Sequence, residues 1–162
     1  MHGAMSYSEY YNRSLAEGQE YQDFVAEQLY KIGLPLFNYA SKKYQIEYGE
    51  NKLGVEIKYD KIHKTTGRVW IEVSEKSNPR NKEYVKSGIY RNDNTWLYVI
   101  GDYSVIYIFS KKLLRQLAES SKYKIRENST KTSEGFLLPL ADVIKYTAKI
   151  INISQLRNVA GR

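Results

Sequence analysis

The residues best placed to do chemistry in this chain lie on two short segments with strand-like alternation. Residues 55–60 read Val-Glu-Ile-Lys-Tyr-Asp, and residues 69–76 read Val-Trp-Ile-Glu-Val-Ser-Glu-Lys. Side chains of a β-strand point alternately to opposite faces, so each segment has one apolar and one polar face. The polar faces are expected to hold Glu56, Lys58 and Asp60 on the first segment, and Trp70, Glu72, Ser74 and Lys76 on the second.

A glycine between the two segments predicts how they pair. The loop Thr65-Thr66-Gly67 has the glycine that a three-residue hairpin loop needs in the left-handed conformation. Keeping both apolar rows on one side requires paired residue numbers of the same parity. The predicted hairpin therefore has three polar cross-strand pairs: Asp60 with Glu72, Lys58 with Ser74, and Glu56 with Lys76.

Two directly opposed carboxylates, about 5 Å apart at Cβ, repel each other unless a cation lies between them. Hard divalent cations prefer carboxylate oxygens, so Asp60 and Glu72 are the predicted ligands of Mg²⁺ or Mn²⁺, with the Val73 carbonyl as a further ligand. Lys58 is then placed to stabilise charge on a phosphate or to orient an attacking water. This set is the minimum for phosphodiester hydrolysis. The alternative is an amphipathic hairpin with a solvated charged face, on which Lys58 and Lys76 neutralise the acids.

The surrounding sequence predicts an α/β fold in a single domain spanning residues 1–162. Helical periodicity covers 18–32 and ends at Gly33. Strands are expected at 44–48, 53–62, 68–75, 95–100 and 104–109, with a short basic helix over 80–90. Ser110 is the expected N-cap of a helix over 111–120. Strands near 123–126 and 136–138 and a helix from about 141 complete the prediction.

Charge favours a polyanionic partner. The chain carries a net charge of +7; residues 1–60 contribute six basic and nine acidic side chains, so the excess lies in residues 61–162. Phosphate contacts release counterions from nucleic acid, which makes such a surface suitable for DNA. The run after the second segment supplies the predicted DNA-binding residues Arg80, Lys82, Lys86 and Arg91. The alternative is a basic surface that is simply solvated.

Composition excludes several other kinds of protein. The chain has no cysteine and only two histidines, so disulfides, thiolate metal sites, zinc centres and nucleophilic triads lack material. No run of about 18 apolar residues predicts a membrane span, and no apolar stretch near the start predicts a signal peptide. A cytoplasmic location is therefore the expectation.

The two segments resemble the PD-(D/E)xK nuclease superfamily, which includes restriction enzymes, Holliday-junction resolvases and phage recombination nucleases. Its pattern is an aspartate, a gap, and then acid-x-Lys on the next strand, which Asp60, Glu72, Val73 and Ser74 resemble. The resemblance implies a restriction-endonuclease-like αβββαβ core over about 18–109, with a central mixed sheet flanked by helices and a C-terminal extension over about 110–157. It also implies Mg²⁺- or Mn²⁺-dependent cleavage of DNA, and it allows a homodimer.

Three features qualify the match. Tyr59 replaces the proline of the pattern, which is dispensable in the superfamily. Ser74 replaces the lysine, and Lys58 across the predicted hairpin, or else Lys76, is the expected substitute. Members often carry another acid on the first helix, for which Glu20 is preferred over Glu27. The alternatives are a catalytically inactive module of the same fold that binds nucleic acid or a protein, and a hydrolase of RNA.

Overall fold

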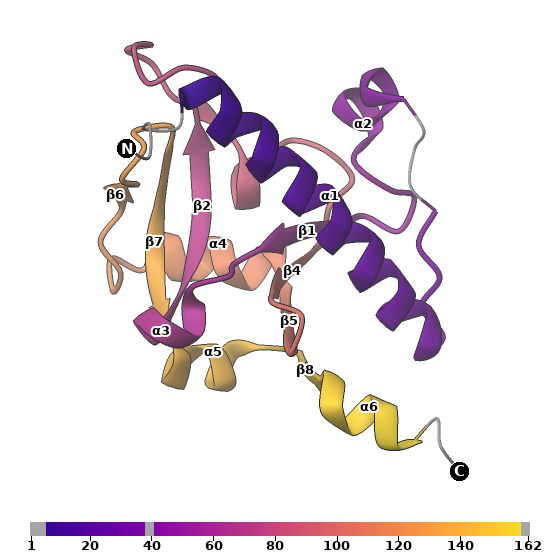
Figure 1. Cartoon of the computed structure of the whole chain (residues 1–162). Coiled ribbons are helices and arrows are strands. Elements are labelled where there is room, and N and C mark those ends of the chain that lie inside the picture. The colour runs from indigo at the N-terminus through magenta and orange to yellow at the C-terminus, as the bar shows by residue number, and fades with distance from the viewer. Residues whose placement is uncertain (1–5, 38–40, 160–162) are drawn as a thin grey trace, which may run out of the picture.

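The computed structural model describes residues 6–37 and 41–159 and confirms the predicted α/β class. Two four-stranded sheets carry the architecture, with strand orders β1-β4-β5-β8 and β3-β2-β7-β6. In Figure 1 the second sheet stands on the left, and α1 crosses in front of the first sheet. None of the helices in the described part is long and apolar enough to cross a membrane.

The first helix, α1 (Tyr7–Lys31), begins eleven residues before the predicted start at 18. Ser6 caps it and forms a reciprocal capping box with Glu9, which satisfies free N–H groups of the first turn. Tyr21, Val25 and Leu29 are buried at helical spacing, so the C-terminal half of α1 packs on the protein. The N-terminal half lacks buried residues, and it therefore extends past the core.

The first sheet contains β1 (Val55–Tyr59), β4 (Leu97–Gly101), β5 (Val105–Ser110) and β8 (Lys149–Asn152). It is mixed, as predicted, because β1 runs parallel to β4 while the other pairs are antiparallel. One face packs under α1 through Val55, Ile57, Val99, Ile106 and Ile108. The predicted alternation of β1 is therefore confirmed for its apolar side.

The second sheet contains β2 (Arg68–Glu75), β3 (Val85–Lys86), β6 (Arg126–Glu127) and β7 (Ser133–Pro139), all antiparallel. It shares a hydrophobic core with the far face of the first sheet and with α4 (Lys111–Glu119). The core includes Val69, Ile71, Tyr98, Phe109, Leu114 and Phe136. Residues after 110 supply β7, in the middle of this sheet, and β8, at the edge of the other.

The segments 55–60 and 69–76 do not form the predicted hairpin. β1 pairs with β4, and β2 pairs with β3 and β7, so the two segments belong to different sheets. A short helix, α3 (His63–Thr66), lies between them, and Gly67 is left-handed (φ 68°) as the cap of that helix rather than as a hairpin loop residue. The conformation of Gly67 was predicted correctly, but the strand pairing that it was taken to set does not exist.

Two other predicted elements are wrong, and two elements were not predicted. The segment 44–48 is a helix, α2 (Lys42–Tyr48), because Ser41 caps it and Tyr44 stacks on Tyr48 one turn later. The segment 80–90 contains β3 and a 3₁₀ turn, η1 (Gly88–Tyr90), instead of a basic helix. The helix expected from 141 is α5 (Leu140–Tyr146), and it is followed by β8 and α6 (Ile153–Val159), which were not predicted. Ser110 caps α4, as predicted.

Candidate functional site

A lysine joins two carboxylates where β1 approaches β2. The Lys58 ammonium lies 3.1 Å from Oε1 of Glu56 and 3.6 Å from Oε1 of Glu72. Glu56 and Lys58 share one face of β1, as predicted, opposite the Val55 and Ile57 face that packs under α1, and Glu72 reaches them from the second sheet. Lys58 and Glu72 were predicted to share one polar site but not to pair with each other, and the structure brings them together from different sheets.

Glu56 is the most unusual member of this site. Its side chain is 2% exposed, and neither carboxylate oxygen accepts a hydrogen bond from any residue that the structure describes. Lys58 forms an ion pair with Glu56, and the buried Lys111 also interacts with it electrostatically. Burying a carboxylate without hydrogen bonds is costly, and proteins keep such groups mainly where they bind a cation or react.

A β-bulge decides which side chains of β2 join the site. Glu72 pairs with Gly135 and Ser74 pairs with the next residue of β7, Glu134, so Val73 is an extra residue in β2. The bulge reverses the alternation, and Ser74 becomes buried and donates a hydrogen bond to Glu134. The predicted pairing of Ser74 with Lys58 is wrong for this reason.

The electrostatics of the site favour a permanently charged Lys58. Burial lowers the pKa of this ammonium, but the carboxylates of Glu72 and Glu56 outweigh burial and hold its pKa well above the ordinary value. The Ser87 hydroxyl donates a 2.9 Å hydrogen bond to Glu72 and orients that carboxylate. Burial and the same two carboxylates also raise the pKa of Tyr98, whose phenol therefore stays protonated.

A further carboxylate, Glu50, belongs to the same electrostatic group. Burial raises its pKa, Glu56 adds to the effect, and Lys58 opposes it. Glu50 lines a hollow of about 390 Å³ together with Lys58, Tyr59 and Lys61. The ionised form of Glu50 is thus disfavoured by folding, although the group is held beside the lysine of the site.

Replacing Glu50 with glutamine is expected to raise the melting temperature at pH 7. A carboxyl whose folded pKa lies above its unfolded pKa contributes stability at low pH, and that contribution is lost as pH rises through the folded pKa. The gain from Glu50→Gln should therefore shrink on acidification and vanish below about pH 4. Thermal melts from pH 3.5 to 8 measure it, with the exposed Glu47→Gln as control. A gain equal at both ends of the range would contradict the assignment.

Asp60, a predicted metal ligand, is held by the backbone. One carboxylate oxygen accepts from the Ile62 amide at 3.2 Å, and the other accepts from the Trp70 amide at 3.1 Å. The Trp70 bond fastens the end of β1 to β2 across the α3 connection, and the Ile62 bond closes a local turn. Asp60 does not face Glu72 as a cross-strand partner, although both line one groove. The Val73 carbonyl accepts from the Ser87 amide at 3.2 Å, and its role as a metal ligand stays a prediction.

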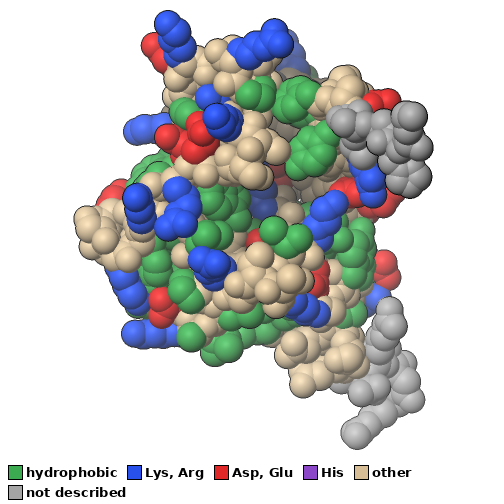
Figure 2. Space-filling view, turned by 60° about the vertical axis from the view of Figure 1, so that its left-hand side comes forward, with side chains coloured by type: hydrophobic (Ala, Val, Ile, Leu, Met, Phe, Trp, Pro, Cys, Tyr) green, Lys and Arg blue, Asp and Glu red, His purple; other side chains and the backbone are tan. Residues whose placement is uncertain are grey.

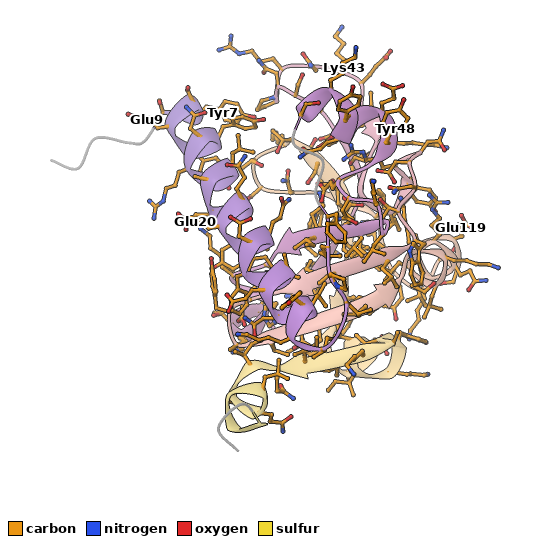
Figure 3. The ribbon with its side chains drawn as sticks, turned by 90° about the vertical axis from the view of Figure 1, so that its right-hand side faces the viewer. Tyr7, Glu9, Glu20, Lys43, Tyr48 and Glu119 are labelled. Atoms are coloured by element: carbon orange, nitrogen blue, oxygen red, sulfur yellow. The ribbon has the colours of Figure 1, made fainter. Side chains whose placement is uncertain are left out.

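The acids predicted on α1 lie away from the lysine. Glu20 is exposed and points away from the sheets in Figure 3, and it does not line the hollow that holds Glu50 and Lys58. Glu27 pairs with Lys31 on the surface of the same helix at 2.8 Å. The acid of α1 that does border the site is Glu17, which lines the hollow beside Glu50 and pairs with Lys61.

The predicted DNA-binding residues are not presented by one helix. Arg80 and Lys82 are exposed on the loop after β2, and Lys86 lies on β3. Arg91 is turned inward, where it pairs with Asp93 at 3.1 Å and donates to the Gln45 carbonyl. Arg91 therefore supports the fold, and DNA binding by the other three stays a prediction. Figure 2 shows basic and apolar side chains interspersed over the face that carries the second sheet.

Two grooves meet at the candidate site. The first, the Trp70 groove, has a volume of about 670 Å³ and is lined by Lys58, Asp60, Trp70 and Glu72 among others. The second, the α1 groove, has a volume of about 530 Å³ and runs between the N-terminal half of α1 and the end of β2. Tyr10, Glu72, Asn128 and Ser133 line both grooves, so the two are continuous.

The sequence contained a signal for Glu56 that the predicted pairing did not use. Glu56-Ile57-Lys58 is itself an acid-x-Lys triplet on a strand, and its two polar side chains share one face by alternation. No serine replaces the lysine in this triplet. Glu50, six residues earlier, is an acid ahead of it. The contact between Lys58 and Glu72 could not be predicted from a local pattern, because the two residues lie on different sheets.

The donor set fits a hard divalent cation held by two carboxylates. The Glu56 oxygens accept no hydrogen bond from the described residues, and both carboxylates converge on one point, which the Lys58 ammonium occupies. Within residues 6–37 and 41–159, no three acids or histidines lie close enough together to hold a metal. Magnesium commonly takes only one or two protein carboxylates and completes its shell with water and substrate phosphate.

Comparison with known proteins identifies no similar protein. The chain matches no protein-family model, and no curated protein or solved structure is significantly similar to it.

Proposed function

We propose that this chain is a metal-dependent nuclease that cleaves DNA, with its active site at Glu56, Lys58 and Glu72. The observation that carries the proposal is the buried carboxylate of Glu56, which accepts no hydrogen bond from the described residues and is paired with Lys58 beside Glu72. Acid-x-Lys triplets are the pattern of the PD-(D/E)xK superfamily, and Glu56-Ile57-Lys58 resembles that triplet. A restriction-endonuclease-like core is part of the proposal.

Each residue has a chemical role in this proposal. Glu56 and Glu72 would hold a Mg²⁺ or Mn²⁺ ion, which when bound supplies Lewis-acid stabilisation of a phosphate. Lys58 binds a non-bridging phosphate oxygen and stabilises the charge that develops there, because its ammonium is charged and its side chain is 34% exposed. Ser87 keeps the Glu72 carboxylate in orientation. The protonated Tyr98 phenol closes the site on the inner side.

An inactive module that binds nucleic acid or a protein is the second candidate. The observation in its favour is that the Lys58 ammonium already lies between the two carboxylates, where it neutralises them as a structural ion pair would. The two candidates differ in their response to divalent ions, because only the nuclease requires Glu56 and Glu72 to exchange the ammonium for a metal.

Incubation of the purified protein with plasmid, linear duplex, single-stranded and four-way-junction DNA tests the proposal. We expect cleavage with Mn²⁺ or Mg²⁺ and none with EDTA. Thermal melts run in parallel should show a higher melting temperature with the ion, because it binds the native state preferentially. Failure to cleave any DNA with either ion, together with an unchanged melting temperature, would favour the inactive module.

A further inference from the structure

Aromatic side chains line both grooves on either side of the candidate active site. Tyr7, Tyr10 and Tyr11 line the α1 groove, and each is exposed by 44–50%. They lie on the side of α1 that faces the second sheet, and Figure 3 shows Tyr7 turned toward the body of the protein while Glu9 points away. The Trp70 groove is lined by Trp70, Tyr10 and Tyr59. Large aromatic faces left open beside an active site are suited to stacking.

The Trp70 indole packs against Gly135 of β7, which fixes its position in the groove. A Cβ added at Gly135 would lie 2.8 Å from the indole ring, so the ring packs directly against the backbone of β7 at this position. The amide of Trp70 is fixed at the same time by the Asp60 carboxylate. The indole therefore has a fixed position, with its remaining surface in the groove.

Basic side chains border the same groove. Lys61, Arg68 and Arg126 line it together with Lys58, against the acids Asp60, Glu72 and Glu127. The lining has four basic and three acidic side chains, and Arg68 and Arg126 are the two basic ones outside the ion pairs of Lys58 and Lys61. The groove thus combines stacking surfaces with cations, which is the combination that binds unpaired nucleic acid.

We propose that the continuous groove binds single-stranded nucleic acid, with unpaired bases stacked on Trp70 and Tyr10 and the backbone passing Lys58. The inference rests on the proposed nuclease function and names its substrate class: single strands and the unpaired arms of branched DNA. A strand that runs from one groove into the other must pass Glu72, because that residue lines both. Base pairs present only their edges, so a duplex cannot stack on the side chains of this groove without opening.

The two tryptophans of the chain make the test specific, because only Trp70 lines a groove described above. Trp96 is 61% exposed and donates to the Leu53 carbonyl elsewhere on the surface. Trp96→Phe leaves Trp70 as the fluorescent reporter, and Trp70→Phe leaves Trp96. Titration with an oligothymidylate of about 20 nucleotides in EDTA, where cleavage is absent, should quench Trp70 emission and leave Trp96 emission unchanged.

Affinity gives the second readout. Tyr10→Ala should weaken binding of the same single strand about tenfold, within the range measured for loss of one stacking side chain. The matched control is Tyr30→Ala, which removes a 71% exposed tyrosine from the other end of α1, outside the grooves. A blunt duplex of the same length should bind at least about tenfold more weakly than the single strand.

The results separate the two proposals. Quenching of Trp96 instead of Trp70, equal losses in Tyr10→Ala and Tyr30→Ala, or a preference for the duplex would overturn the single-strand groove, even if the protein cuts DNA. Specific Trp70 quenching in a protein that cuts no DNA would support the groove and reject the nuclease. Binding of an acidic peptide with the same Trp70 response, without binding of oligothymidylate, would identify a protein ligand and overturn the inference.

Discussion

Replacing Lys58 with alanine is expected to reduce DNA cleavage by about 10²- to 10³-fold, the loss typical when one preorganised charge is removed from a developing oxyanion. The variant should also lose about 2 kcal/mol of folding free energy, because the buried Glu56 carboxylate loses its ion pair with Lys58. This cost is below that of a fully buried pair because the Lys58 side chain is 34% exposed.

Divalent ions should stabilise Lys58→Ala more than the wild type. The ammonium and the metal compete for Glu56 and Glu72, so removing the ammonium leaves the carboxylates free to bind the ion. Melting temperatures measured with and without Mn²⁺ report this difference, and single-turnover cleavage reports the rate. Lys31→Ala removes an exposed lysine that pairs with Glu27 and is the control. A cleavage rate equal to that of the wild type would show that Lys58 is not the phosphate-binding lysine of the active site. Lys76 would then be the next candidate for that role.

Replacing Glu56 with glutamine should abolish cleavage and the effect of Mn²⁺ on the melting temperature, and yet leave the protein at least as stable as the wild type. Glutamine has the same shape and removes a buried charge that accepts no hydrogen bond from the described residues. Lys58 keeps its contact with Glu72 at 3.6 Å, so the lysine is not left unpaired. A residue that opposes stability and supports function is the expected signature of an active-site carboxylate.

Glu47→Gln is the matched control for this experiment, because it makes the same chemical change at an exposed position of α2. Isothermal titration with Mn²⁺ separates a lost binding site from a slowed reaction. Retention of cleavage and of the Mn²⁺ response in Glu56→Gln would show that Glu56 is only a structural counter-charge for Lys58. The metal would then have to be held by Asp60 and Glu72, as the hairpin pattern predicted.

The sequence alone determined the local features. Alternation identified the polar face of β1, the bounds of β2 were predicted at 68–75, and Ser110 was recognised as the cap of α4. Each of these depends on a few neighbouring residues: a period of two along a strand, or a side chain that reaches the next turn of a helix. The α/β class follows from the same local periods.

Only the tertiary structure decided which residues meet. β1 joined β4 because its apolar residues complete the surface under α1. The helix at 44–48 is a different case, because its Ser41 cap is a local signal that the strand prediction overlooked. A local pattern cannot choose between an adjacent strand and one forty residues later, since both offer apolar neighbours. The bulge at Val73 then removed Ser74 from the polar face, and packing of the two sheets brought Glu72 to Lys58. The site is therefore a product of long-range burial, which side-chain alternation within either strand does not encode.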